Sequence, residues 1–205
     1  MATKGRRKSA KVAATATADQ ILEATLALAE ESSWDEIRLR LVAERLEIPL
    51  SEALKHYRDL DAVADAWFGR ALAAVLASPP EGFAELPARE RLHLMLMRWF
   101  DALARHKSVT GQMLSTKLYL SHPHHWVPMI FNLSRTIQWL RDAALLDAGG
   151  LRRQVEEVGL TSLFLATLAY WLRDESPAQE RTRNFLARGL GIADEAMARF
   201  SDSYG

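Results

Sequence analysis

RLRLVAERLEIPLSEALKHY, residues 38–57, is the stretch that decides the fold. In its first half the apolar residues recur at the spacing of one helix face: Leu39, Val42, Ala43 and Leu46. After a break of three residues, 47–49, the second half repeats that spacing in four residues that we expect to face the core: Leu50, Ala53, Leu54 and Tyr57. Pro49 suits the first turn of a helix, where a backbone N–H is not needed. Two short amphipathic helices joined by so short a turn are typical of a helix-turn-helix motif.

Helices on either side of this motif complete a three-helix module. Thr17 or Asp19 can cap a first helix that stops near residues 31–33, and Asp35 can cap the second. A helix restarts at Asp59 and would link the module to the rest of the chain. The same spacing predicts further helices over residues 92–103, 113–120, 129–140, 151–173 and 177–190.

No part of the sequence alternates with the period of two that half-buried strands show, so we predict an all-α fold. Residues 1–17 are expected to form a basic disordered tail, and residues 18–66 the helix-turn-helix module. Residues 67–205 would form a larger helical domain that binds an effector and dimerises.

The composition of the 205 residues excludes several classes of protein. The chain has 49% hydrophobic and 25% charged residues, as ordinary globular proteins do, and no net charge. It has no cysteine, which excludes disulfides, thiolate metal sites and cysteine nucleophiles. The longest charge-free apolar run, residues 158–172, is shorter than the roughly 20 residues of a membrane-spanning helix. We therefore expect a cytoplasmic protein without a membrane span.

The histidines do not form a recognisable metal or catalytic site. His122, His124 and His125 cluster in a loop, but their spacing is not specific to one metal. His93 and His106 are expected on helix surfaces. Because no catalytic motif is found either, we predict no metal, no cofactor and no enzymatic activity.

The order of helices resembles the TetR family of one-component repressors. The matching segments are ILEATLAL (21–28), RLVAER (40–45), LKHY (54–57) and DLDAV (59–63). The C-terminal part is similar to a subgroup related to the mitochondrial lipid-binding accessory protein of ubiquinone biosynthesis, through Trp139, Arg152-Arg153, WLRDESP (171–177), Arg181-Thr182 and Phe185-Leu186. The family implies a dimeric repressor that a small hydrophobic effector releases from DNA. The subgroup implies an alternative, a lipid-binding or partner-binding protein that has lost DNA binding.

Five positions depart from the family pattern, among them Pro49 and Leu50, which stand where the recognition helix usually begins with Ser-Lys. Arg38 stands where the second helix commonly begins with Thr, and Leu54 stands where a Tyr often contacts phosphate. Glu47 replaces the usual Gly of the turn. A left-handed backbone costs an L-residue about 1 kcal/mol, so the turn at Glu47 either accepts this cost or takes another shape.

The residues expected to contact double-stranded DNA come from the tail, the start of the second helix and the third helix. They are Lys4, Arg6, Arg7, Lys8, Arg38, Ser51, Glu52, Lys55, His56 and Tyr57. Residues 21–70 contain eleven acids and six bases, a net charge of −5 that opposes binding to a polyanion. Binding would then depend on the tail, since residues 1–20 carry a net charge of +4. The tail can also be a tag-like disordered segment or a targeting sequence, and the charged faces merely solvated.

Large apolar side chains in the C-terminal domain predict two further sites. The first would bind a small hydrophobic ligand or lipid, and its residues would be Met95, Trp99, Met113, Leu118, Phe131, Ile137 and Trp139. Plain core packing of these side chains is the alternative. Residues 155–172 are apolar around most of a helix, more than one buried face explains. We therefore expect a homodimer interface built from Val155, Gly159, Ser162, Leu163, Ala166, Tyr170, Phe185 and Leu186.

Overall fold

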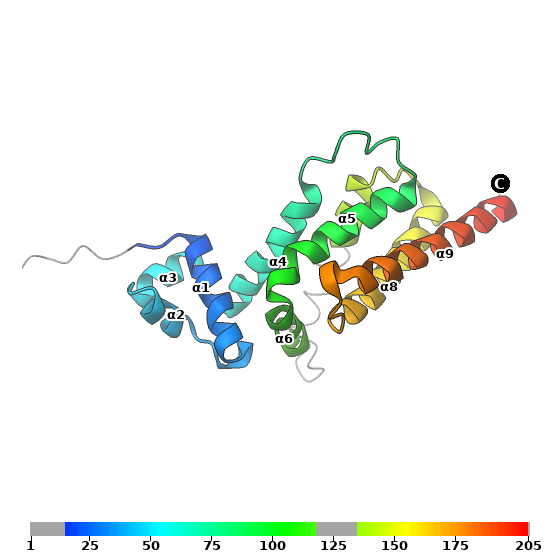
Figure 1. Ribbon diagram of the computed structural model, residues 1–205. Coiled ribbons are helices and arrows are strands. Elements are labelled where there is room, and N and C mark those ends of the chain that lie inside the picture. The colour runs from blue at the N-terminus through cyan, green and yellow to red at the C-terminus, as the bar shows by residue number, and fades with distance from the viewer. Residues whose placement is uncertain (1–14, 118–134, 205) are drawn as a thin grey trace, which may run out of the picture. The chain divides into compact units, whose positions relative to one another are not determined.

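The computed structural model describes residues 15–117 and 135–204, and these form helices and turns without a strand (Figure 1). The predicted all-α fold is confirmed. The chain divides into two compact units after Asp65, within helix α4 (Leu60–Leu76). No helix of the described ranges combines the length and hydropathy that crossing a bilayer requires. Several residues singled out in the sequence lie outside these ranges: Lys4, Arg6, Arg7, Lys8, Leu118, Phe131, His122, His124 and His125.

The first unit consists of α1 (Ala18–Glu31), α2 (Leu39–Arg45) and α3 (Leu50–His56), which pack on one another around a small core. Helix α1 begins with a capping box. The Thr17 hydroxyl accepts a hydrogen bond from the Gln20 backbone at 3.2 Å, and the Gln20 side chain accepts one from the Thr17 backbone at 2.8 Å. The core is filled by Ile21, Leu22, Leu26, Val42, Ala53 and Tyr57.

Helix α2 does not begin at Asp35. That residue lies in a 3-10 turn, η1 (Trp34–Glu36), and Arg38 occupies the N-cap position of α2 in an extended conformation. Trp34 and Ile37 are buried on either side of this turn, with exposed fractions of 7% and 2%. The burial of these two apolar side chains therefore holds the start of α2 in place, instead of the side-chain cap at Asp35 that the sequence suggests.

The turn between α2 and α3 takes the left-handed conformation. Glu47 has a φ of 53°, its N–H donates to the Glu44 carbonyl, and the N–H of Ile48 donates to the Ala43 carbonyl. This pair of hydrogen bonds is the Schellman motif that ends many helices. Because it satisfies the last carbonyls of α2 and buries Ile48, it offsets the backbone cost of a non-glycine residue.

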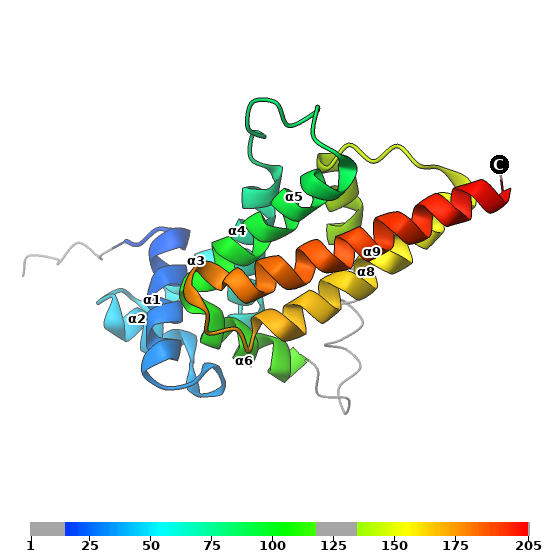
Figure 2. The ribbon, with the colours of Figure 1, turned by 45° about the vertical axis from the view of Figure 1, so that its right-hand side comes forward.

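The second unit is a bundle in which α8 (Gly150–Trp171) and α9 (Glu180–Tyr204) lie side by side, while α5 (Ala88–Leu103) packs on α9 (Figure 2). Turn η2 (Ala104–His106) connects α5 to α6 (Lys107–Lys117), residues 135–143 are helical, and η3 (Pro177–Gln179) precedes α9. The ring of Trp99 meets those of Phe100 and Phe164 edge-on, with centroids 5.2 and 5.0 Å apart. The contact between Trp99 and Phe164 packs α5 against α8.

Three expectations for this unit are wrong. Helix α6 begins at Lys107 rather than at residue 113, because only Val109 and Met113 give its polar sequence an apolar period. Helix α9 continues to Tyr204 instead of ending near residue 190, because its last turns extend beyond the core. His106 is not a surface residue. It is 5% exposed, and its ring lies edge-on to Trp67 on α4.

Candidate functional site

Helix α3 is held by two residues and presents the rest of its surface outward. Ala53 is fully buried and Tyr57, which follows the helix, is 7% exposed. The Tyr57 hydroxyl donates to the backbone carbonyl of Ala18, the first residue of α1, at 3.2 Å. The burial of Tyr57 removes it from the side chains that a ligand of this helix can reach. Among the other proposed contacts on α3, Glu52 is half-buried and three are exposed: Ser51, Lys55 and His56.

Two leucines of α3 are not in the core, contrary to the sequence expectation. Leu50 is 42% exposed and Leu54 is 45% exposed. They are four residues apart, so they lie on the same side of the helix. A helix of seven residues has too few turns for apolar spacing alone to tell a core face from an outer face. The exposed surface of α3 is therefore partly apolar.

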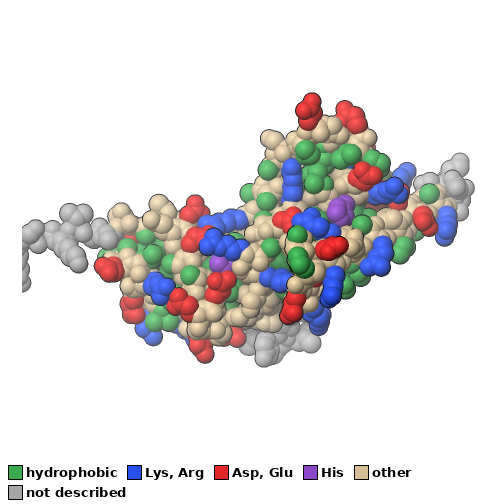
Figure 3. Space-filling model, in the orientation of Figure 1, with side chains coloured by type: hydrophobic (Ala, Val, Ile, Leu, Met, Phe, Trp, Pro, Cys, Tyr) green, Lys and Arg blue, Asp and Glu red, His purple; other side chains and the backbone are tan. Residues whose placement is uncertain are grey.

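Carboxylates neutralise most of the cations near this surface. Lys55 Nζ lies 2.5 Å from Glu52 Oε2 on the same helix. Arg40, Arg45 and Arg58 form similar pairs with Glu44, Glu31 and Asp59. Acidic and basic side chains are accordingly interspersed on the face of this unit in view (Figure 3). Arg38 instead donates to the backbone carbonyls of Asp35 and Ile37, neutral acceptors that leave its charge available.

Helix α8 has one face in the core and a second apolar face that is exposed. Leu160, Phe164, Thr167 and Trp171 are buried in the chain's own bundle. The outer face contains large apolar groups, of which Val158 is the most exposed at 68%, and small residues between them. The predicted interface residues on this face are Val155, Gly159, Ser162, Ala166 and Tyr170. None of the described residues packs over this apolar face, and exposed apolar surfaces often mark an interaction site.

The other predicted interface residues lie deeper. Leu163 is half-buried against Gly189 of α9. The two residues are so close that a Cβ at position 189 would collide with the Leu163 side chain. The half-buried Phe185 ring stacks on Tyr170, with centroids 4.7 Å apart and planes inclined by 6°. Leu186 is fully buried in the chain's own core, so the structure contradicts its assignment to a surface between two copies. The apolar spacing of α9 did not separate its inner face from its outer one.

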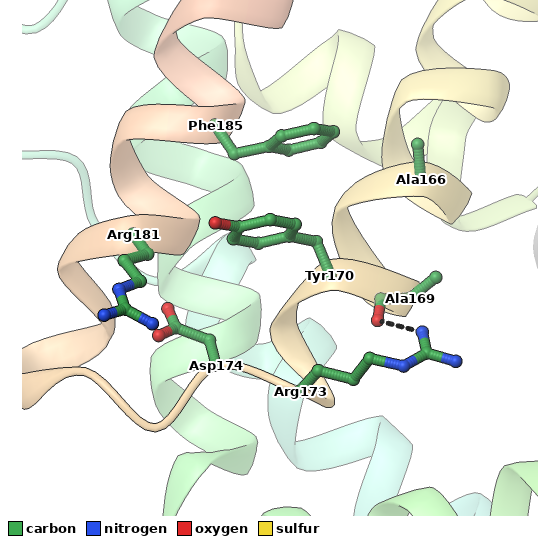
Figure 4. Close-up of a pocket in the computed structure, with 7 residues that line it drawn as sticks. All are labelled: Ala166, Ala169, Tyr170, Arg173, Asp174, Arg181 and Phe185. Carbon is green, nitrogen blue, oxygen red and sulfur yellow. Dashed lines mark hydrogen bonds between the residues drawn. The ribbon is translucent and has the colours of Figure 1, made fainter.

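A cleft of about 300 Å³ lies where α8 ends and α9 begins (Figure 4). Its lining combines small residues, the stacked rings and charged groups: Ala166, Ala169, Tyr170, Arg173, Asp174, Arg181 and Phe185. The Arg173 guanidinium donates to the backbone carbonyl of Ala169 at 3.0 Å, which holds it along α8 (Figure 4). The cleft therefore continues the exposed face of α8 and gives its end a polar boundary.

Asp174 joins the ends of these two helices. Its Oδ1 accepts from the backbone N–H and hydroxyl of Ser176 at 2.9 and 2.6 Å. Its Oδ2 accepts from the backbone N–H and hydroxyl of Thr182 at 2.8 and 2.6 Å. Burial alone would raise the pKa of this carboxyl, but the hydrogen bonds from Ser176 and Thr182 outweigh it and hold the pKa well below its usual range. From the sequence, Asp174 was quoted only as part of WLRDESP (171–177) and was given no role; the local signal there is Ser176-Pro177, a helix start.

The proposed ligand residues lie mostly inside the bundle. Met95, Trp99, Met113 and Ile137 are buried, with exposed fractions between 0 and 6%. Trp139 is 36% exposed and lies under the guanidinium of Arg135, 5.9 Å from its ring centroid. The structure thus brings four of these side chains into the core and leaves Trp139 apart. Within the described ranges, His, Asp and Glu side chains nowhere gather in threes as a metal site would require.

No protein-family model and no curated protein matches the chain. Several solved structures, in contrast, match the chain. A TetR transcriptional regulator from Nitrosomonas europaea ATCC 19718 is 39% identical, with a TM-score of 0.78, over 86% of this chain and 97% of the other. A TetR transcriptional regulator from Rhodococcus sp. RHA1 has a TM-score of 0.59 at 14% identity, over 85% of this chain and 93% of the other. The match to the Rhodococcus protein shows a shared fold. The match to the Nitrosomonas protein, at 39% identity over most of both chains, also shows a close evolutionary relationship.

Proposed function

Because the chain belongs to the TetR family of transcriptional regulators, we propose that it is a dimeric repressor that a small hydrophobic effector releases from its operator. The family is one of DNA-binding regulators and not of enzymes. The observation that carries the proposal is the presentation of α3, which Ala53 and Tyr57 anchor while Ser51, Lys55 and His56 point outward. A helix presented in this way can enter the major groove. The regulator would act in the cytoplasm.

We assign different roles to the charged residues around α3. Ser51, Lys55 and His56 would reach base edges, while Arg38 at the start of α2 would contact phosphate. Since residues 21–70 carry a net charge of −5, the bases of the tail would supply the remaining attraction to DNA. Selection of duplexes from a random-sequence pool by the full chain tests this function directly. Enrichment of no sequence, with no binding to DNA flanking its own gene, would remove it.

Deletion of residues 1–14 is expected to weaken operator binding and its dependence on salt. The deletion removes five basic residues but keeps Thr17, the cap of α1, and Ala18, the acceptor for Tyr57. The slope of log K against log salt should become less negative by about one for each phosphate that the tail no longer neutralises. Fluorescence anisotropy with a selected duplex, from about 50 to 200 mM salt, measures this slope. An unchanged slope would mean that the tail does not touch phosphate.

Replacing Glu52 by Gln is expected to strengthen DNA binding by about three- to tenfold at low salt, since the change is worth about 1 kcal/mol of electrostatics. It removes the carboxylate 2.5 Å from Lys55 Nζ and so frees a cation on the exposed side of α3. Glu44→Gln is the matched control, because it changes the net charge equally and breaks the pair with Arg40 on α2. Equal gains in both variants would point to bulk charge, against a specific role for Lys55.

We propose that two copies pair through the exposed face of α8 together with α9. Four helices, two from each copy, would then bury Val155, Val158, Ala166 and their counterparts in one bundle. Dimeric regulators of this type read two half-sites whose centres are about 34–36 Å apart. An apolar effector within the second unit would lower affinity by changing the separation of the two recognition helices.

A second candidate is the lipid-binding or partner-binding role that the ubiquinone-related subgroup implies. The negative charge of residues 21–70 and the exposed Leu50 and Leu54 favour it, since neither suits simple phosphate binding. Protein purified from its own host should then carry a stoichiometric isoprenoid or acyl lipid, detected by extraction and mass spectrometry. Recovery of no lipid, and no thermal shift with such lipids, would count against it.

A further inference from the structure

The most unexpected feature of the exposed side of α3 is its pair of leucines. Leu50 and Leu54 are more than two-fifths exposed, although the first unit has an apolar core beside them. That core is filled by residues such as Ile21, Leu22 and Val42, each at most 1% exposed. The two leucines are thus only partly buried in the folded chain, and the area that stays exposed to water is unfavourable unless another role offsets it.

The neighbours of these leucines indicate what could cover them. Ser51 and Lys55 follow them in sequence and are exposed, so the apolar pair borders the surface that would face DNA. The Glu52–Lys55 ion pair reduces the net charge there, so phosphate attraction alone does not explain this surface. The apolar group that the major groove offers is the C5-methyl of thymine, which aliphatic side chains contact.

We infer that Leu50 and Leu54 read thymine methyl groups in the major groove and so set the sequence preference of each half-site. This inference rests on the proposed DNA-binding function. Residues four apart on a helix are separated by about 6 Å along its axis, which spans at most about two base-pair steps of about 3.4 Å. Each half-site should therefore contain two thymines within two steps of each other.

Replacing single thymines by deoxyuridine tests the inference, because it removes only the methyl group. The probe is a duplex that the full chain selects from a random-sequence pool. Two thymines per half-site should be sensitive, and each replacement should weaken binding by about fourfold, as expected for one methyl withdrawn from an apolar contact. In Leu50→Ala and Leu54→Ala, one of the two positions should lose its sensitivity. Both variants should fold, since neither leucine belongs to the buried core of the first unit, and thermal melting checks this.

Leu76→Ala is the matched control, since Leu76 is 53% exposed on α4, in the other unit. It should leave the deoxyuridine effects unchanged. Binding of selected DNA with no deoxyuridine effect, or with effects that persist in both leucine variants, would overturn the inference while leaving the proposed function intact. Selection of no DNA would overturn both. If phosphatidylcholine vesicles then bind the wild type but not the double variant, the leucines serve a lipid surface instead.

Discussion

Replacing Ala166 by Arg is expected to convert the proposed dimer into monomers and to weaken operator binding by about a hundredfold or more. Ala166 lies on the exposed face of α8 among the apolar residues proposed to pair. In the proposed interface a guanidinium at this position would be buried without a partner between two copies, which costs several kcal/mol. Because each monomer would bind one half-site of the operator, loss of pairing also removes the gain in affinity that comes from binding two half-sites at once.

Sedimentation velocity and anisotropy measure the two effects together. Circular dichroism should show unchanged helix content, since Ala166 is exposed within its own chain. Ala73→Arg, at an exposed position of α4, is the control for adding the same charge elsewhere and should remain dimeric. A variant at Ala166 that still sediments as a dimer would place the interface on another surface.

Replacing Asp174 by Ala is expected to lower the free energy of unfolding by about 3 kcal/mol, the effect of losing several hydrogen bonds to a buried charge. The change leaves the N–H groups and hydroxyls of Ser176 and Thr182 without their acceptor, where α8 passes into α9. Urea unfolding at fixed protein concentration measures the loss, since a dimer's stability depends on concentration. Glu175→Ala, at the exposed neighbouring position, should have little effect.

Acid should reproduce part of this loss in the wild type. The folded-state pKa of Asp174 lies below its unfolded value of about 3.9, so its stabilisation is complete above that pH. As the pH falls below about 4 towards the folded pKa, the carboxyl takes up a proton and the stabilisation is lost. Asp174→Asn should unfold with a weaker dependence on pH in this range. An equal dependence in both proteins would show that other carboxyls dominate.

Much of the first unit follows from local sequence. The fold adopts three features that the local sequence predicts: the cap at Thr17, the apolar faces of α1 and α2, and the short connection at residues 47–49. For Glu47 the sequence left two possibilities open, a left-handed backbone at some cost or a turn of another shape, and the structure has the left-handed one, with a φ of 53°. The compensation could not be predicted in the same way, because the Schellman hydrogen bonds depend on the position of Ile48.

The errors have a common physical cause. Apolar spacing identifies residues that avoid water, but it does not say whether the chain itself or a partner excludes the water. Leu50 and Leu54 were placed inside and are exposed, while Leu186 was placed at an interface and is fully buried. His106 was predicted at the surface because nothing near it in the sequence indicates that it is buried. Its burial depends on contact with Trp67 of α4, which is far away in sequence. Tertiary packing decides such residues, and no local pattern records it.

The hydroxyl of Tyr57 and the side chain of Ala53 anchor α3 from its inner side, while its outer positions take no part in that anchoring. If the protein binds DNA as proposed, support and recognition are allotted to different residues of one short helix. Retargeting the protein to another operator would then need a library at positions 50, 51 and 54–56 only, with 53 and 57 kept constant. Natural divergence could follow the same route, acquiring a new binding sequence without first losing the scaffold.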